Sequence, residues 1–271
     1  MTSPTDRTAA PVAAITDDGW DALGYAALLD ELARRGHSLS AAAPHLAWTS
    51  NGTGIGSPAG GAQPVAGPQR GLEEVLEHVS KEVSGVAITV LARPPAAVAR
   101  HLVTPAGADA TARPRALVAG VNHGPNVGAD LIHSGTFGCA LTAAWHGLPA
   151  LAVSLDDVYS VDEANPGPLR FDLAARAAGL ALDWLLARDA PLLVNLNIPN
   201  SVVLGETCFI ATMARTDAGH DSTADHHTDR QVLARGQASL TVFAGCDLRG
   251  DTTQGLALAR HLDRAFANMR S

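Results

Sequence analysis

Short apolar segments alternate with longer amphipathic segments along most of this chain of 271 residues. The apolar segments, such as residues 12–15, have the length of a strand and are apolar throughout, as in a sheet that is buried on both faces. The segments between them, such as residues 21–35, carry apolar residues on one face of a helix. This alternation predicts an α/β fold with a Rossmann-like, mostly parallel sheet and helices on both faces.

The same pattern gives the expected elements of the first 199 residues. Strands are expected at residues 12–15, 39–43, 86–91, 116–121, 151–155 and 192–198. Helices are expected at residues 21–35, 72–82, 95–103, 136–146 and 171–188. Residues 48–68 are rich in glycine, serine, threonine and proline and are interpreted as a loop. In sheets of this kind, binding sites form in the loops at the carboxyl ends of the strands.

The pattern changes after Pro199. Two further strands are expected at residues 202–214 and 237–243, with a polar loop between them, and a helix follows at residues 253–269. We interpret residues 1–11 as a disordered lead-in and residues 12–199 as the α/β core. Residues 200–271 are interpreted as a β-rich arm and helix of the same domain that contribute to subunit contact.

The charge balance and the cysteines exclude several classes of protein. The 27 acidic residues outnumber the 19 basic ones, which argues against nucleic-acid binding through an overall positive field. Lys81 is the only lysine and follows no glycine-rich run, which excludes a P-loop. Three widely separated cysteines indicate reduced thiols, and no apolar run approaches the roughly 18 residues of a membrane span. We therefore expect a cytoplasmic protein with no nucleic-acid and no membrane partner.

Two adjacent carboxylates, Asp17 and Asp18, directly follow the first expected strand. Like charges this close raise one another's pKa unless a cation neutralises them. Hard divalent ions such as Mg²⁺ use oxygen ligands of this kind. The alternative interpretation is an acidic turn in which Asp18 or Asp21 caps the following helix.

Two further loops carry polar groups next to expected strands. The loop around Thr49 and Ser50 is rich in hydroxyls and glycines, which suits an anion or a metal ligand, although a flexible surface loop is the alternative. Residues 120–136 contain Asn122, several glycines, Ser134 and Thr136, and they open a helix, where a phosphate can bind. The alternative here is a structural glycine loop with Ser134 as a helix cap. Together, the three loops predict metal-assisted hydrolysis of a phosphate ester.

Several segments resemble the SurE family, the stationary-phase survival proteins, which are metal-dependent 5′/3′-nucleotidases. The resemblance rests on ITDDG after the first strand, AAPHLAWTSNG after the second, and the run GVNHGPNVGADLIHSGTFG followed by GLPALAVSL. NLNIP and HTDRQVLARGQASLTVF also match family segments. The resemblance covers residues 12 to about 250. It implies a SurE-like fold, a homodimer or homotetramer, and a nucleotide or another small phosphate ester as the substrate.

The resemblance also implies the roles of individual residues. A divalent ion, Mg²⁺ or Mn²⁺, would bind Asp17, Asp18, Asn122 and either Thr49 or Ser50. One of the two aspartates would also act as the general base in catalysis. The phosphate would bind Asn126, Ser134, Gly135 and Thr136.

The sequence departs from the family pattern at several positions. Thr16 stands where the family has asparagine and His133 where it has tyrosine, and the loop at residues 49–52 is altered. His133 is a candidate for substrate contact or proton donation, and an exposed histidine is the alternative. The departures leave open a phosphatase specialised for another ester and a non-catalytic phosphate or nucleotide binder.

The sequence also contains a second polar cluster, and it lacks the residue patterns of two rival reactions. The polar loop after Pro199 holds a set of acids and histidines that would suit either a metal site or an exposed loop: His220, Asp221, Asp225, His226, His227 and Asp229. A deacetylase of the PIG-L type would need a histidine where Ile15 stands. An aspartyl-phosphate phosphatase would need two aspartates separated by one residue.

Overall fold

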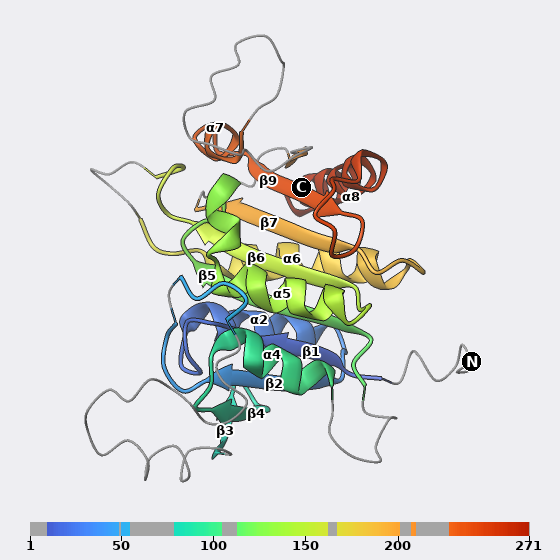
Figure 1. Ribbon diagram of the computed structural model, residues 1–271. Coiled ribbons are helices and arrows are strands. Elements are labelled where there is room, and N and C mark those ends of the chain that lie inside the picture. Colours follow the sequence, from blue (N-terminus) through green and yellow to red (C-terminus); the bar gives the residue numbers. More distant parts are fainter. Residues whose placement is uncertain are drawn as a thin grey trace.

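A computed structural model of the protein describes residues 10–48, 50–54, 79–104, 113–161, 167–200, 207–209 and 228–270. The described residues form a nine-stranded sheet in the order β3-β4-β2-β1-β5-β6-β7-β9-β8 (Figure 1). The strands are β1 (Val12–Ile15), β2 (Leu39–Pro44), β3 (Val79–Val83), β4 (Val86–Leu91), β5 (Ala116–His123), β6 (Ala150–Asp156), β7 (Leu193–Pro199), β8 (Thr207–Phe209) and β9 (Ala238–Phe243). The predicted α/β class and the mostly parallel sheet are therefore confirmed.

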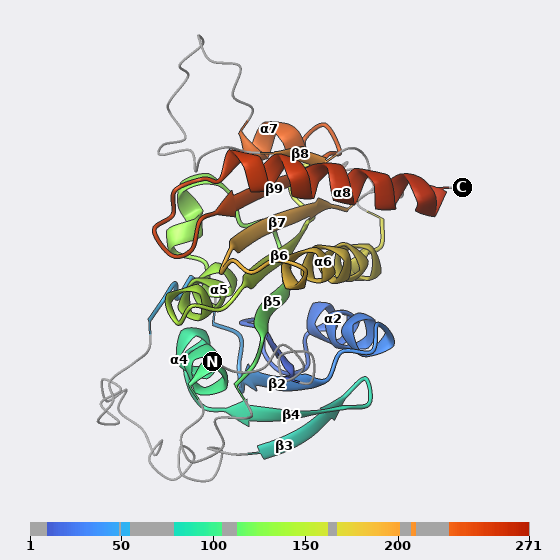
Figure 2. The same cartoon turned by 90° about the vertical axis from the view of Figure 1, so that its right-hand side faces the viewer.

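Helices cover both faces of the sheet (Figure 2). On one face lie α2 (Leu23–Arg34), α6 (Phe171–Leu186) and α8 (Thr252–Arg270), and on the other lie α4 (Pro95–Val103) and α5 (Gly135–Trp145). Two short helices, η2 (Gly128–Ile132) and α7 (Asp229–Leu233), lie in connections. Each face has its own apolar core, because strands that are buried on both sides send alternate side chains to opposite faces.

The order in which strands are added to the sheet reverses beside β1. From β1 it moves to β2 on one side, and it later returns to β5 on the other side. The strands from β4 to β7 in the sheet order pair in parallel, so their carboxyl ends meet at one edge. A reversal of strand order in a parallel sheet opens a crevice outside those ends. The loops after β1 and β5 are therefore the ones expected to carry a site.

The helix expected at residues 72–82 is wrong for the part that the structure describes. Residues 79–83 form β3, which pairs antiparallel with β4. The two strands are joined at Ser84 and Gly85, whose φ angles of 50° and 76° are those of a tight hairpin turn. The remaining residues of the expected helix, 72–78, lie outside the described residues.

The described residues after Pro199 extend the core sheet. β9 pairs antiparallel with β7, β8 pairs with β9, and α8 packs against α6, β8 and β9. Most of the strand expected at residues 202–214 lies outside the described residues, as does the polar cluster from His220 to His227. The division into a core and an arm for subunit contact stays a prediction.

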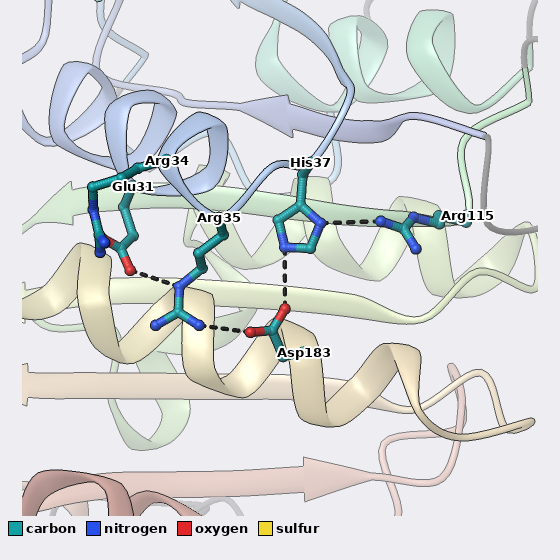
Figure 3. A network of polar contacts seen from close by, with 6 residues as sticks. All are labelled: Glu31, Arg34, Arg35, His37, Arg115 and Asp183. Atoms are coloured by element: carbon teal, nitrogen blue, oxygen red, sulfur yellow. Dashed lines mark hydrogen bonds and ion pairs between the residues drawn. The ribbon is translucent and has the colours of Figure 1, made fainter. Parts of the chain in front are cut away.

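A network of polar contacts lies near the amino ends of β2 and β5, at the opposite edge of the sheet from the loops after β1 and β5. Arg35 and His37 both contact the carboxylate of Asp183 on α6, and Arg115 contacts His37 (Figure 3). These contacts join α2, α6 and β5 away from the crevice. No helix in the described part of the chain is long and apolar enough to cross a membrane.

Candidate active site

Asp17 and Asp18 lie at the carboxyl end of β1, next to the loop that follows β5. Asp17 is only 5% exposed, and Asp18 is partly buried. The backbone N–H of His123, the last residue of β5, donates a hydrogen bond of 3.0 Å to Asp18 Oδ2. The backbone N–H of Asp18 in turn donates to the buried hydroxyl of Thr16 at 3.1 Å. These contacts fix the Asp18 carboxylate between the two central strands.

The pKa of both carboxyl groups is raised. Burial, followed by repulsion from Asp18, raises the pKa of Asp17 to about 7. Burial also raises the pKa of Asp18, opposed by the N–H and the charge of His123. No ion pair joins either carboxylate to an arginine or lysine in the described part of the chain. A buried and a partly buried carboxylate, adjacent and without such a partner, are the arrangement that a divalent cation stabilises.

The amino terminus of α5 lies directly against Asp17. The hydroxyl of Thr136 donates a hydrogen bond to Asp17 Oδ1. A Cβ atom added to Gly135 would lie 2.5 Å from Asp17 Oδ2, so only glycine permits this approach. Ser134 is the helix cap, and its hydroxyl oxygen accepts a hydrogen bond from Phe137 N–H at 3.0 Å. The cap interpretation of Ser134 is confirmed, and the Thr136 hydroxyl is directed to the carboxylate.

The loop after β2 packs onto the same helix start. The N–H of Gly52 donates to the carbonyl of His133 at 2.9 Å, and a Cβ atom at Gly52 would lie 2.8 Å from the carbonyl oxygen of Ile132. Ser50, of the same loop, is exposed. The other candidate hydroxyl, Thr49, lies outside the described residues. The first and second loops also meet, because Trp48 N–H donates to the Asp17 carbonyl at 2.8 Å.

Asn122 and His123 end β5 and face different partners. The side-chain nitrogen of Asn122 donates to the carbonyl of Gly124 at 2.6 Å, which leaves its side-chain oxygen as the atom suited to a cation. The ring of His123 contacts Asp157 Oδ2 at 2.7 Å and meets the Phe171 ring edge-on. The side chain of His133 is exposed, so it is accessible to solvent and to ligands.

Asn126 is buried, and its side chain is already engaged. Its side-chain nitrogen donates to the hydroxyl of Ser154 on β6 at 2.9 Å. Its backbone contacts the side chains of Asn195 and Asn197 on β7. These bonds hold the side-chain amide of Asn126 toward the sheet. The predicted contact from Asn126 to phosphate stays a prediction.

The structure also brings in residues that the sequence reasoning did not assign to the site. They are Thr16, Ser154, Asn195, Asn197, Ser239 and Asp229, all buried. Polar residues two apart inside an otherwise apolar strand, as in Asn195 and Asn197, are the signal that marks them, because such residues share one face of the sheet.

The donor set at this edge fits a divalent cation. In the described residues, no third carboxylate, histidine or cysteine joins the pair of aspartates into a cluster. Further ligands would therefore be amide and hydroxyl oxygens, for which Asn122 and Ser50 are the predicted candidates among the described residues. Oxygen ligands of this kind are those of Mg²⁺ and Mn²⁺.

Comparison with known proteins agrees with this architecture. The family model of the survival protein SurE matches residues 14–221. A protein named 5′-nucleotidase SurE from Solidesulfovibrio magneticus is 32% identical over 83% of this chain and 88% of its own. Another, from Anaeromyxobacter dehalogenans, is 44% identical, but the match spans only 35% of this chain and 35% of that relative.

A solved structure shows the same fold. The crystal structure of the SurE protein from Aquifex aeolicus matches with a TM-score of 0.63, covering 93% of this chain and 99% of that one at 17% identity. The family model covers well over half of the chain, from before the two aspartates to beyond β8. The chain therefore belongs to the SurE family.

Proposed function

We propose that this protein is a metal-dependent phosphomonoesterase that hydrolyses nucleoside monophosphates. One observation carries the proposal: buried Asp17, adjacent to the partly buried Asp18, lies against the amino terminus of α5, and neither carboxylate is paired to an arginine or lysine among the described residues. A carboxylate pair attracts a cation, whereas a helix amino terminus attracts an anion. The two features side by side suit a metal ion and a phosphate group together.

Asp17, Asp18 and the side-chain oxygen of Asn122 would hold the divalent ion, with Ser50 or Thr49 as the hydroxyl ligand. When bound, the ion would neutralise phosphoryl oxygens and lower the pKa of a bound water. The Thr136 hydroxyl, which donates to Asp17, keeps that carboxylate in a fixed orientation. Asp18 is the more accessible of the two carboxylates and is the better candidate to accept a proton from the attacking water.

The phosphate would lie at the first turn of α5. Ser134 O–H and the backbone amides of that turn would donate to the phosphoryl oxygens and stabilise the charge that develops on them. Only one lysine exists in the chain, so arginine, metal, hydroxyls and amides must supply this stabilisation. His133 is exposed beside this turn, where it is a candidate for contact with the ester group.

The names of the relatives support a nucleotide as the substrate, and one aromatic residue offers a surface for the base. Of the three aromatic residues that lie nearest the loops in the sequence, Phe137 is buried against Phe243, and the ring of Trp20 is covered by Lys81. Trp48 is 36% exposed, and its backbone bonds to Asp17. It is therefore the candidate for stacking on a base.

A phosphate-release assay tests the proposal. Purified protein with Mg²⁺ or Mn²⁺ is expected to release phosphate from 5′- and 3′-nucleotides, and chelation with EDTA is expected to abolish release. Asp18→Asn is expected to lose at least about 100-fold in kcat, typical of losing a general acid–base group. Release that is equal in Asp18→Asn and wild type would contradict the proposal. Metal-dependent nucleotide binding without release would instead indicate a non-catalytic binder.

The assembly and the cellular location are proposals of the same kind. We expect a homodimer or homotetramer, as the family resemblance implies, and a cytoplasmic protein. Light scattering on the purified chain tests the first expectation. Fractionation of the source cells tests the second.

A further inference from the structure

Five polar side chains lie on one face of the sheet where apolar ones would be expected. Ser154 on β6, Asn197 on β7 and Ser239 on β9 pair in register across the three strands, and Asn195 pairs with Thr241 one step away. All five are at most 1% exposed. Buried polar groups cost free energy unless they are hydrogen-bonded, so these five side chains need hydrogen-bond partners above the sheet.

The partner is the backbone of Asn126, in the glycine-rich loop after β5. Asn126 N–H donates to Asn197 Oδ1 at 2.8 Å, and Asn197 Nδ2 donates back to the Asn126 carbonyl at 3.0 Å. The side-chain amide of Asn197 thus pairs with one residue of the loop as a neighbouring strand would. Asn195 Nδ2 adds a second bond to the same carbonyl at 2.9 Å, and Asn197 Nδ2 also donates to Ser239 Oγ at 3.1 Å.

The loop is held from a second side by α7. The carboxylate of Asp229, 3% exposed, accepts a hydrogen bond from Gly128 N–H at 3.2 Å. Arg230 contacts Asp130 at 3.1 Å. The loop forms no strand or helix of its own between residues 124 and 127. The buried backbone groups of Asn126 therefore depend on the side chains of Asn195 and Asn197 for hydrogen bonds, and the N–H of Gly128 depends on that of Asp229.

The position of this loop fixes two parts of the candidate active site. Upstream it follows the end of β5, which carries Asn122, the proposed metal ligand, and downstream it leads through η2 to Ser134 at the start of α5. Displacement of a reacting group by about 1 Å can cost on the order of 100-fold in rate. A shift of the Asn126 peptide would move both ends relative to Asp17 and Asp18, which are attached to β1.

We propose that Asn197 is a positioning residue of the active site, whose side-chain amide fixes the loop of residues 124–128 by two opposed hydrogen bonds to Asn126. Asn195 and Asp229 support the same loop with one bond each. The consequence for catalysis rests on the proposed function. The consequence for the loop and for metal binding does not require turnover.

The test compares Asn197→Ala with Val194→Ala. Val194 is a fully buried residue of the same strand, and its side chain belongs to the core on the opposite face. Both variants are expected to lower Tm, but only Asn197→Ala touches the loop. Hydrogen exchange of the peptide covering residues 122–131, the affinity for Mn²⁺ by calorimetry, and kcat on a nucleotide are measured for each.

Asn197→Ala is expected to speed exchange at Asn126 and Gly128 and to weaken Mn²⁺ binding about 10-fold or more, with a larger loss in kcat than in KM. Val194→Ala is expected to change none of these. Asn195→Ala, which removes one bond, is expected to fall between them. If Asn197→Ala does not fold, Asn197→Asp serves instead, since it keeps the acceptor for Asn126 N–H and removes both donated bonds.

Unchanged exchange in the loop would overturn the proposal, as would faster exchange with unchanged Mn²⁺ affinity. Equal effects of Asn197→Ala and Val194→Ala would also overturn it, because they would reduce Asn197 to a contribution to stability. Lack of hydrolysis by the wild type contradicts only the proposed function. Exchange and Mn²⁺ affinity then still decide whether Asn197 positions the loop.

Discussion

Gly135 lies so close to Asp17 that a Cβ atom at position 135 would be 2.5 Å from Asp17 Oδ2. We predict that Gly135→Ala pushes the carboxylate away from Thr136 and lowers kcat/KM about 10-fold or more. Alanine favours a helix by about 1 kcal/mol relative to glycine, so this loss would not follow from helix propensity. Steady-state kinetics with Mn²⁺ and thermal unfolding measure the two effects separately.

Gly147→Ala is the matched control for this prediction. Gly147 follows the other end of α5, has a φ of 75°, and has open space where a Cβ would be. Alanine there is strained by about 1 kcal/mol, so it should lower Tm and leave kcat/KM unchanged. If Gly135→Ala retains wild-type kinetics, the close contact with Asp17 has no part in catalysis.

Asp17→Asn should stabilise the metal-free protein while it removes activity. The pKa of the Asp17 carboxyl is raised to about 7, mainly by burial, so its charged form is unfavourable in the folded state at neutral pH. Removing that charge should raise the free energy of unfolding by about 1–3 kcal/mol, since one pKa unit corresponds to about 1.4 kcal/mol. Thermal unfolding in EDTA, and then with Mn²⁺, measures the change, and the increase of Tm on adding Mn²⁺ should shrink.

The same substitution at Asp156 provides the contrast. Asp156 is buried, but its carboxylate accepts hydrogen bonds from the N–H groups of Val158, Tyr159 and Ser160. Asp156→Asn should therefore destabilise the metal-free protein. A loss of stability in Asp17→Asn as well would show that the charge on Asp17 is satisfied without a metal ion.

The sequence predicted most of the sheet because its strands are short, apolar and separated by helical patterns. It failed at residues 79–82, where apolar spacing fitted a helix, although the hairpin turn at Ser84 and Gly85 was present in the sequence. In the candidate site, Asp17 and Asn122 were predicted together because Asp17 follows β1 and Asn122 lies at the end of β5, and these two strands are neighbours in the sheet. Asn197 was not, because its role depends on which loop lies above its face of the sheet.

The stability of the protein should fall below about pH 6.5 through His37. Arg115 can only donate a hydrogen bond, so the His37 Nδ1 that it contacts at 3.0 Å must be unprotonated, and Nε2–H then donates to Asp183 (Figure 3). Burial lowers the pKa of His37, opposed by Asp183 and assisted by Arg115 and Arg35. A histidine with a lowered pKa in the folded state contributes stability above its unfolded pKa, and this is lost as the pH falls.

Thermal unfolding of wild type and His37→Gln between pH 5 and pH 8 measures this contribution. Other groups also titrate in this range, so the quantity of interest is the difference between the two proteins. The deficit of His37→Gln relative to wild type should be largest at pH 8 and should shrink toward pH 5. A deficit that is independent of pH would mean that His37 is not held in its neutral form.

Trp48→Leu should weaken the binding of nucleotides and spare small phosphate esters. Trp48 is 36% exposed on the loop after β2, and its backbone N–H donates to the carbonyl of Asp17. Stacking of a base on an aromatic ring contributes about 1–3 kcal/mol, so KM for AMP should rise about 5- to 100-fold. KM for β-glycerophosphate, which has no base, should stay within about twofold of wild type, because leucine leaves the backbone contact to Asp17 in place. An equal rise for both substrates would indicate that Trp48 supports the metal site through its loop, and unchanged values for both would place the base elsewhere.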